Sequence, residues 1–403
     1  MNKSDATRIE RVLTKLSYKK TLNEKEADLI VVVACSIRQS AVDRIYGKFK
    51  WWKRRQKKGE LTTVLTGCVL PFDAKKFKPK FDLIFDIKDL NKLPALLHSV
   101  DKRIPSNYLE VNPVYNSKFQ AFVPVITGCD NFCTYCAVPY TRGREKSRPY
   151  KDIIKEVKAL IKKNYKEITL LGENVNSYKY DFPKLLEEIA QMPGQFWIRF
   201  TAPHPKDFSD ELIRIIAKYP KICKQINLPV QSGNDKILKR MNRPYTVAQY
   251  TNLVARIRKA MPNISISTDC IVGFPGETKK QFNDSCKLFK KIKFNMAFIA
   301  QFSPRPGTPA SRLKDNVSPK EKQRREKELT KVLKQTATKI NKKLIGQTVK
   351  VLVEKYRKDH WLGRTEQNVT VRFNAPEAKK ITGKFINIKI TEAQAFSLKG
   401  KLF

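Results

Sequence analysis

Three cysteines lie close together in one short loop, at Cys129, Cys133 and Cys136, with the spacing C-x3-C-x2-C. The loop follows the apolar run 122–126, as a loop after a buried strand would. Three thiolates can hold three irons of a cubane cluster, whereas clusters that only carry electrons use four. A structural zinc site needs four protein ligands, and a disulfide needs an oxidising compartment that nothing else in the sequence indicates. The spacing therefore predicts an iron–sulfur cluster with one iron open to a substrate.

Residues 1–105 alternate between strand and helix patterns, which is typical of a small doubly wound α/β sheet. Helical spacing of apolar residues predicts a first helix up to residue 16, with Ser4 or Asp5 as its cap, and a second over 38–50. The expected strands are 28–34, 62–66 and 81–85. The first of them is continuously apolar, as strands buried in parallel sheets are.

Cys35 and Cys68 each lie just past the end of one of these strands. Loops at the carboxyl ends of neighbouring parallel strands converge on one crevice, so the two thiols could act as a pair of metal ligands. A buried free cysteine also behaves as a small hydrophobic residue. The sequence alone leaves both interpretations open.

The central region repeats strand and helix six times, which predicts an open (β/α)6 partial barrel. Ligands of such barrels bind at the carboxyl ends of the strands. Glu173 follows the second strand, and Gly273 and Glu277 follow the fifth. The glycine would let a ligand approach the backbone, and the acids could hold an amino group or a ribose hydroxyl. The expected strands are 121–126, 167–171, 197–201, 225–229, 264–271 and 297–302, and the expected helices are 151–162, 183–191, 207–217, 247–260 and 279–292.

The C-terminal region begins with Ser318-Pro319-Lys320-Glu321, which reads as a capping box with proline at the first helical position. The helix that follows is expected to reach about Leu344. Short alternating segments then predict a small β-barrel whose lysines and arginines suit phosphate contacts. Its expected strands are 349–353, 369–373, 385–390 and 395–398.

The charge balance is strongly basic, with 81 Lys and Arg against 38 Asp and Glu and a net charge of +43. Such a field predicts a polyanionic partner, in the first place a nucleic acid, although a lysine-rich proteome would also contribute. The longest apolar run, 29–35, is too short to span a bilayer, and the cysteines suit a reducing compartment. We therefore expect a cytoplasmic protein. We expect its domains at 1–105, 119–340 and 341–403, with 106–118 as a linker.

The segment 128–149, GCDNFCTYCAVPYTRGREKSRP, resembles the radical S-adenosylmethionine methylthiotransferases, and within them the tRNA branch that acts on isopentenylated adenosine. Further similar motifs are ACSIRQSA at 34–41, LTGC at 65–68, IVGFPGET at 271–278 and SPRPGTPA at 303–310. The C-terminal barrel is similar to a TRAM domain, an RNA-binding module. The motifs extend over nearly the whole chain, so the resemblance implies the same α/β fold, with a radical SAM partial barrel at its centre.

The resemblance also implies two [4Fe-4S] clusters. The three-cysteine loop would hold the first, which binds S-adenosylmethionine, and an auxiliary cluster on Cys35 and Cys68 would supply sulfur. A carbon radical derived from S-adenosylmethionine would remove hydrogen from C2 of adenosine 37 of tRNA, which then receives the methylthio group. The partners implied are the tRNA anticodon stem-loop and a reductant such as flavodoxin or ferredoxin, acting on a monomer. Residues carried over as contacts of S-adenosylmethionine are Tyr135, Glu173, Gly273 and Glu277; no catalytic side chain is assigned.

The auxiliary cluster of the family has a third cysteine, which precedes a Met-Asn pair like Met1-Asn2. We expect that cysteine just upstream of Met1. Cys223, Cys270 and Cys286 lie outside the ligand motifs and are expected to be structural thiols. Two alternatives stay open: a sister enzyme acting on threonylcarbamoyl-adenosine or a ribosomal-protein aspartate, and an RNA-binding radical SAM protein without a functional auxiliary cluster.

Overall fold

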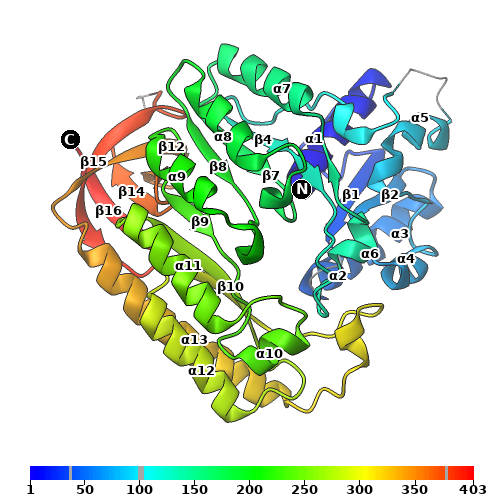
Figure 1. Ribbon diagram of the computed structural model, residues 1–403. Helices are drawn as coiled ribbons and strands as arrows, with labels where there is room; N and C mark the ends of the chain where they lie inside the picture. Colours follow the sequence, from blue (N-terminus) through cyan, green and yellow to red (C-terminus); the bar gives the residue numbers. More distant parts are fainter. Residues whose placement is uncertain (36–38, 99–103, 377–379) are drawn as a thin grey trace. The chain divides into compact units, whose positions relative to one another are not determined.

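The computed structural model describes residues 1–35, 39–98, 104–376 and 380–403 (Figure 1). It divides into two compact units. The first comprises residues 1–116, 126–148 and 303–312, and the second comprises 117–125, 149–302 and 313–403. The three-cysteine loop thus belongs to the same unit as the N-terminal sheet.

The first unit is built on a parallel sheet in the order β1 (Leu29–Cys35), β2 (Thr62–Cys68), β3 (Leu83–Ile84). Helices cover both faces, which confirms the doubly wound arrangement. One core joins α1 (Asn2–Lys15) to the segments after β3, and another joins α2, α3 and α4. The remaining elements of this unit are α2 (Gln39–Tyr46), α3 (Phe49–Lys57), α4 (Pro71–Phe77), η1 (Ile87–Lys92), α5 (Leu93–Leu96), η2 (Tyr108–Glu110), β5 (Ile126–Thr127), α6 (Val138–Arg142), β6 (Lys146–Ser147) and η5 (Pro309–Arg312).

Three local expectations for this unit were wrong. The helix expected over 38–50 is two helices, α2 and α3, separated near Gly47; residue 38 lies outside the described residues. The first helix starts at Asn2 with Met1 as its cap, because Asp5 is used inside the helix to bind a buried arginine. Strand β1 is half-buried instead of fully buried, since it is an edge strand beside a cavity of about 860 Å³ that α1 also lines.

The second unit contains the six strands expected of the open partial barrel, arranged as two three-stranded parallel sheets. Strands β4, β7 and β8 pair in that order, and β9, β10 and β11 pair likewise. A parallel bridge from Ile198 to Ile222 joins the two halves. The strands are β4 (Gln120–Pro124), β7 (Glu167–Leu171), β8 (Trp197–Phe200), β9 (Gln225–Asn227), β10 (Ser265–Val272) and β11 (Met296–Gln301). The helices are α7 (Tyr150–Lys162), η3 (Val175–Ser177), α8 (Phe182–Gln191), η4 (Pro205–Asp207), α9 (Asp210–Lys218), α10 (Asp235–Arg240), α11 (Val247–Ala260), α12 (Lys279–Ile292) and α13 (Pro319–Lys342).

The chain ends in a closed five-stranded barrel with the order β12-β13-β14-β16-β15. Its strands are β12 (Thr348–Arg357), β13 (His360–Thr365), β14 (Thr370–Asn374), β15 (Phe385–Ala393) and β16 (Ser397–Leu402). Strand β13 was not expected from the sequence, because Gly363 and the charged Arg364 interrupt its apolar pattern. Gly363 is needed there, since a Cβ atom would lie 2.5 Å from the carbonyl oxygen of Leu352.

The barrel packs against the first residues of β7 and β8 in the same unit. Trp197 stacks edge-on against Phe385, with ring centroids 4.7 Å apart. At the same interface, Glu167 accepts a hydrogen bond from Arg199 at 2.7 Å and pairs with Arg364 at 3.2 Å. Arg199 also donates to the Thr365 carbonyl oxygen at 2.9 Å. The barrel is therefore held by a buried aromatic contact and a buried charge network together.

Helix α13 begins as expected at Ser318, whose side chain accepts a hydrogen bond from the Glu321 backbone at 3.2 Å. The reciprocal half of the capping box was wrong. The Glu321 carboxylate binds Arg324 and Arg325 instead, because a charged hydrogen bond to a guanidinium is stronger than one to a backbone amide.

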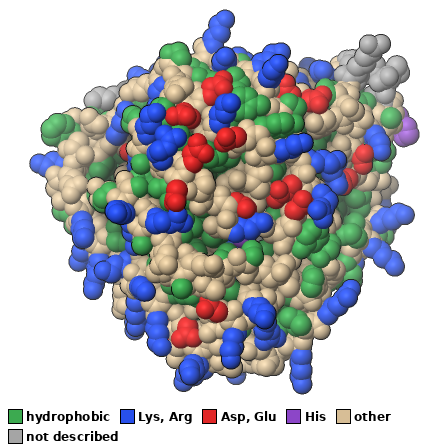
Figure 2. Space-filling model, in the orientation of Figure 1, with side chains coloured by type: hydrophobic (Ala, Val, Ile, Leu, Met, Phe, Trp, Pro, Cys, Tyr) green, Lys and Arg blue, Asp and Glu red, His purple; other side chains and the backbone are tan. Residues whose placement is uncertain are grey.

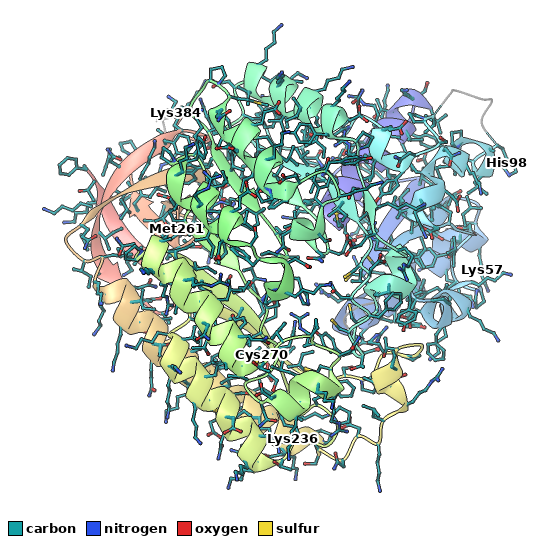
Figure 3. All side chains as sticks on the ribbon, viewed as in Figure 1. Lys57, His98, Lys236, Met261, Cys270 and Lys384 are labelled. Atoms are coloured by element: carbon teal, nitrogen blue, oxygen red, sulfur yellow. The ribbon has the colours of Figure 1, made fainter. Side chains whose placement is uncertain are left out.

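Lys and Arg side chains are scattered over the face drawn in Figure 2 and are more frequent there than Asp and Glu. Among the described residues, no helix combines the length and apolarity that crossing a bilayer requires. Cys223, Cys270 and Cys286 are buried free thiols in the second unit (Cys270 is labelled in Figure 3). Burial raises the pKa of Cys223 to about 12 and that of Cys286 to about 11, as expected of structural thiols.

Candidate active site

The three-cysteine loop is closed at its base by a two-residue antiparallel ladder. Ile126 pairs with Ser147 and Thr127 with Lys146. Gly128 then turns the chain with φ +81°, and a Cβ atom there would lie 2.2 Å from the Arg144 carbonyl oxygen. Only glycine fits this close backbone approach. The ladder and the glycine fix where the loop starts and ends.

Within the loop, Cys129 and Cys133 are buried and Cys136 is half-buried, all as free thiols. N–H groups point at two of the sulfurs: Asn131 Nδ2 donates to Cys129 Sγ at 3.4 Å and the Val138 amide to Cys136 Sγ at 3.5 Å. Burial raises the pKa of the Cys129 thiol. In the part of the chain that the structure describes, no three His, Cys, Asp or Glu side chains converge to hold a metal ion. The fit to a cluster therefore rests on the soft donor set and on these N–H···S contacts.

Cys35 and Cys68 lie side by side at the carboxyl ends of β1 and β2. The parallel register pairs them directly, which places their backbones about 4.8 Å apart. Gly67 permits this close pairing, because a Cβ atom at its φ of +101° would lie 2.6 Å from the Ala34 carbonyl oxygen. Asn2 reaches the same place, donating to the Ala34 carbonyl at 2.7 Å and lying 3.4 Å from Cys68 Sγ.

The side chain of Arg142 connects the three-cysteine loop to the pair Cys35 and Cys68. This role of Arg142 was not predicted from the sequence. Arg142 ends α6, directly after the loop, and its side chain is buried. Its Nε donates to Cys68 Sγ at 3.0 Å, its Nη2 donates to Asn2 Oδ1 at 2.8 Å, and Asp5 supplies the counter-charge. Burial alone would lower the pKa of Arg142, but Asp5 and Cys68 outweigh it and raise the pKa. The sequence feature that could have identified this contact is Arg142 itself, because it is a charged residue in the motif that follows the three cysteines.

The segment 303–312 also contacts the three-cysteine loop. The Ala310 amide donates to the Thr134 carbonyl oxygen at 2.8 Å, inside the loop. Arg305 forms a second buried ion pair, with Asp73 at 2.6 Å, and donates to Gln39. Tyr135, expected to contact a ligand, is half-buried in the loop.

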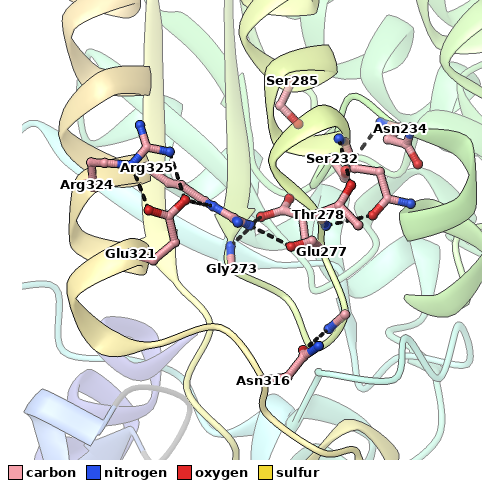
Figure 4. Close-up of polar contacts among 12 residues, drawn as sticks. Ser232, Asn234, Gly273, Glu277, Thr278, Ser285, Asn316, Glu321, Arg324 and Arg325 are labelled. Atoms are coloured by element: carbon pink, nitrogen blue, oxygen red, sulfur yellow. Dashed lines mark hydrogen bonds and ion pairs between the residues drawn. The ribbon is translucent and has the colours of Figure 1, made fainter.

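The remaining predicted residues lie in the second unit, at the carboxyl edge of its sheet. Glu173 is half-buried, two residues after β7. Gly273 follows β10, and its backbone N–H donates to Glu277 Oε2 at 2.7 Å (Figure 4). Arg325 of α13 donates to the same carboxylate oxygen at 2.7 Å. Burial raises the pKa of Glu277, and these two bonds offset the rise only in part. Glu277 therefore shapes the Gly273 turn and binds it to α13.

The same edge carries polar pairs that the sequence did not single out. Asn174 donates to Asp207 at 2.9 Å, and Asn176 accepts from the His204 amide at 2.7 Å. Burial, together with the cations of Arg243 and Lys206, lowers the pKa of His204 to about 2. The His204 imidazole is therefore neutral at physiological pH and acts here as an acceptor for a backbone amide, at 3.2 Å from the Lys206 nitrogen.

Three known protein families match successive parts of the chain. Residues 123–289 match the Radical SAM superfamily, residues 1–86 match the Uncharacterized protein family UPF0004, and residues 342–403 match the TRAM domain. The last match covers the closed five-stranded barrel.

Solved structures share the fold at low identity. The cobalamin-dependent S-adenosylmethionine radical enzyme OxsB matches with a TM-score of 0.50 and 14% identity, over 83% of this chain and 50% of that one. The radical S-adenosylmethionine methyltransferase TsrM of Kitasatospora setae matches with a TM-score of 0.51 and 13% identity, over 75% and 66% of the two chains.

Full-length relatives are closer. The tRNA-2-methylthio-N(6)-dimethylallyladenosine synthase of Clostridium novyi is 40% identical, covering all of this chain and 94% of the relative. The enzyme of the same name from Carboxydothermus hydrogenoformans is 37% identical, covering all of this chain and 97% of the relative.

The open parallel sheet and the three-cysteine loop thus define a radical S-adenosylmethionine enzyme that carries a C-terminal TRAM domain. Such an enzyme uses an iron–sulfur cluster and S-adenosylmethionine. The chain belongs to the tRNA-2-methylthio-N(6)-dimethylallyladenosine synthase family, the tRNA methylthiotransferases.

Proposed function

We propose that the protein inserts a methylthio group at C2 of isopentenylated adenosine at position 37 of tRNA. The observation that carries the proposal is the full-length similarity, at about 40% identity, to synthases named for that modification. The tRNA would bind as the anticodon stem-loop, in keeping with the TRAM barrel and the net charge of +43.

In this proposal Cys129, Cys133 and Cys136 hold the cluster that binds S-adenosylmethionine. That cofactor supplies the radical needed at C2, a C–H bond that no side-chain base could ionise. The buried position of Cys129 and Cys133 keeps water from the sulfurs. Gly273, Glu173 and Tyr135 remain the proposed contacts of S-adenosylmethionine, and Glu277 positions the Gly273 turn.

Cys35 and Cys68 would hold the auxiliary cluster, together with the third ligand that the family resemblance implies. Their direct pairing across β1 and β2 supports this role. The N–H group of Arg142 aimed at Cys68 Sγ supports it further, because such hydrogen bonds stabilise ligand sulfur.

Iron content tests the two cluster sites separately. After anaerobic reconstitution we expect about eight irons per chain, and about four when Cys129, Cys133 and Cys136 are changed to alanine together. The double variant Cys35→Ala/Cys68→Ala should also retain about four. Cys223→Ala, which removes a buried thiol outside both sites, is the control and should not change the iron content.

About four irons in the unaltered chain, with no loss in Cys35→Ala/Cys68→Ala, would exclude the auxiliary site on these residues. It would favour an RNA-binding radical SAM protein instead.

Nucleoside analysis of tRNA from a deletion strain tests the substrate. We expect the methylthio derivative of isopentenyladenosine to disappear and the unmethylthiolated nucleoside to accumulate. Restoring the wild-type chain, but not the Cys129→Ala variant, should reverse the change. Loss of methylthio-threonylcarbamoyl-adenosine instead would assign the protein to the sister activity.

The proposal also includes a monomeric enzyme in the cytoplasm that receives electrons from a flavodoxin or ferredoxin. Its functional domains would be 1–105, 119–340 and 341–403. The three profile matches support that division in outline.

A further inference from the structure

One face of the first unit concentrates positive charge. Residues 44–58 and 71–80, which contain α3 and α4, carry twelve Lys and Arg against the single acid Asp73. Asp73 is buried and bound to Arg305, so it does not reduce the charge of the surface. In chain order this face lies before the three-cysteine loop and far from the C-terminal barrel.

Helices α3 and α4 form one continuous surface because a cluster of aromatic rings joins them. The ring of Phe49 lies 5.9 Å from that of Phe77 and 5.3 Å from that of Phe81, and Trp52 lies 5.8 Å from Phe81. Lys80 lies over the Phe49 ring at 5.1 Å. The inner faces of both helices are thereby fixed, and their basic residues are left to point outward.

Three cations of this surface pair with acids beside it, Lys48 with Glu24 and both Arg55 and Lys58 with Glu60. Other cations of the surface are exposed and have no such pair in the described part of the chain. Lys57, for example, extends away from the ribbon of α3 (Figure 3). Within the described residues, none of six exposed cations forms an ion pair. These six are Lys53, Arg54, Lys57, Lys75, Lys76 and Lys78.

Aromatic rings accompany the cations. Phe72 at the start of α4 is 45% exposed, and Lys76 lies 4.2 Å from its ring centroid. Trp51 on α3 is half-buried, with Arg55 5.3 Å from its ring. Exposed rings between cations suit bases stacked beside a phosphate backbone, and they favour a nucleic acid over a purely anionic surface.

The opposite face of the same sheet shows that general lysine richness does not explain this pattern. Residues 1–16, 86–98 and 104–116, which contain α1, η1 and η2, carry six Lys and Arg against five Asp and Glu. A proteome-wide excess of lysine would charge both faces alike. The asymmetry within one unit is therefore specific to the α3–α4 surface.

We propose that the α3–α4 surface binds the phosphate backbone of RNA, as a contact separate from the C-terminal barrel. The inference rests on the proposed tRNA function and adds a second contact region for that substrate. Its ligand is recognised by charge and by stacking on exposed rings, without any requirement for base sequence.

The test compares two fourfold substitutions in the full-length, reconstituted protein. Lys53→Gln/Arg54→Gln/Lys57→Gln/Lys76→Gln neutralises the α3–α4 surface. The control Lys15→Gln/Lys19→Gln/Lys25→Gln/Lys92→Gln removes the same charge from exposed residues outside it. Binding to unmodified tRNA is measured as a function of salt concentration.

Each phosphate contact contributes about 0.7 to 0.9 to the slope of log affinity against log salt. We expect the α3–α4 variant to lose up to about 3 from that slope and at least about tenfold in affinity near 0.15 M salt. The control should retain the wild-type slope. Equal effects of the two variants, or no effect of the first, would overturn the proposal.

Vesicles of anionic phospholipid provide the competing outcome. If the α3–α4 variant loses vesicle binding while its tRNA slope is unchanged, the surface is a membrane contact and the proposal fails. Unchanged nucleosides in the deletion strain would refute the tRNA methylthiotransferase function. That result would not affect a change in the salt slope of the α3–α4 variant, which tests RNA binding alone. The two proposals can therefore fail independently.

Discussion

Gly128 shows how a single residue decides the geometry of the three-cysteine loop. Its φ of +81° and the 2.2 Å separation from the Arg144 oxygen leave no room for a side chain. We predict that Gly128→Ala opens the base of the loop and lowers the iron retained after reconstitution by about half, to about four per chain. Gly59→Ala, at a positive φ with no neighbouring atom, is the control for backbone strain alone. Equal iron content in both variants would contradict this account.

His204 predicts a pH dependence of folding stability. Its pKa of about 2 in the folded chain lies below the unfolded value of about 6.5, so the unfolded state takes up the proton first as the pH falls. The contribution of His204 is complete above pH 6.5 and is lost progressively below it. We expect His204→Gln to lose less stability than the wild type between pH 6.5 and 4.5, by on the order of 2 kcal/mol. Denaturant unfolding at both pH values measures this, with the exposed His98→Gln as control.

At the scale of elements, periodicity located the helices and strands of the second unit well. Helices α11 and α12 and strand β7 have the expected bounds, because each combines a regular apolar pattern with a clear cap or turn. The errors fall where tertiary contacts override local pattern. Strand β13 is set by its neighbours in a closed barrel, and Asp5 serves a partner 137 residues away in sequence instead of the helix end.

The barrel interface yields a prediction about the elements it joins. Glu167 is buried between the guanidinium groups of Arg199 and Arg364. Glu167→Gln keeps the shape but removes the carboxylate that the buried Arg199 binds directly, so we expect a loss of about 3–5 kcal/mol in the free energy of unfolding. Glu211→Gln, which removes an exposed partner of Arg214, should change stability little. Similar losses in both variants would show that the network is not specifically stabilising.

For the whole molecule, the barrel is part of the second unit and not a loosely tethered module. It covers Trp197 and Cys223, which are both nearly inaccessible. We expect a chain ending at Lys342 to bind RNA more weakly, to melt at a lower temperature and to bind an apolar dye, because this surface becomes exposed. Glu366→Ala, which removes a single contact of the barrel to the Lys224 amide, is a mild control. A truncated chain that melts like the full-length protein would contradict a structural role of the barrel.

The sequence by itself predicted the chemistry, since three thiols with this spacing suit the ligand set of an iron–sulfur cluster. It also determined the α/β repeats, because apolar periodicity is a local property of the chain. Only the tertiary structure decided which distant residues meet. It paired Cys35 with Cys68 through strand register, placed Arg142 and Asn2 beside Cys68, and committed Glu277 to Gly273 and Arg325. These contacts depend on burial and register, which no short stretch of sequence encodes.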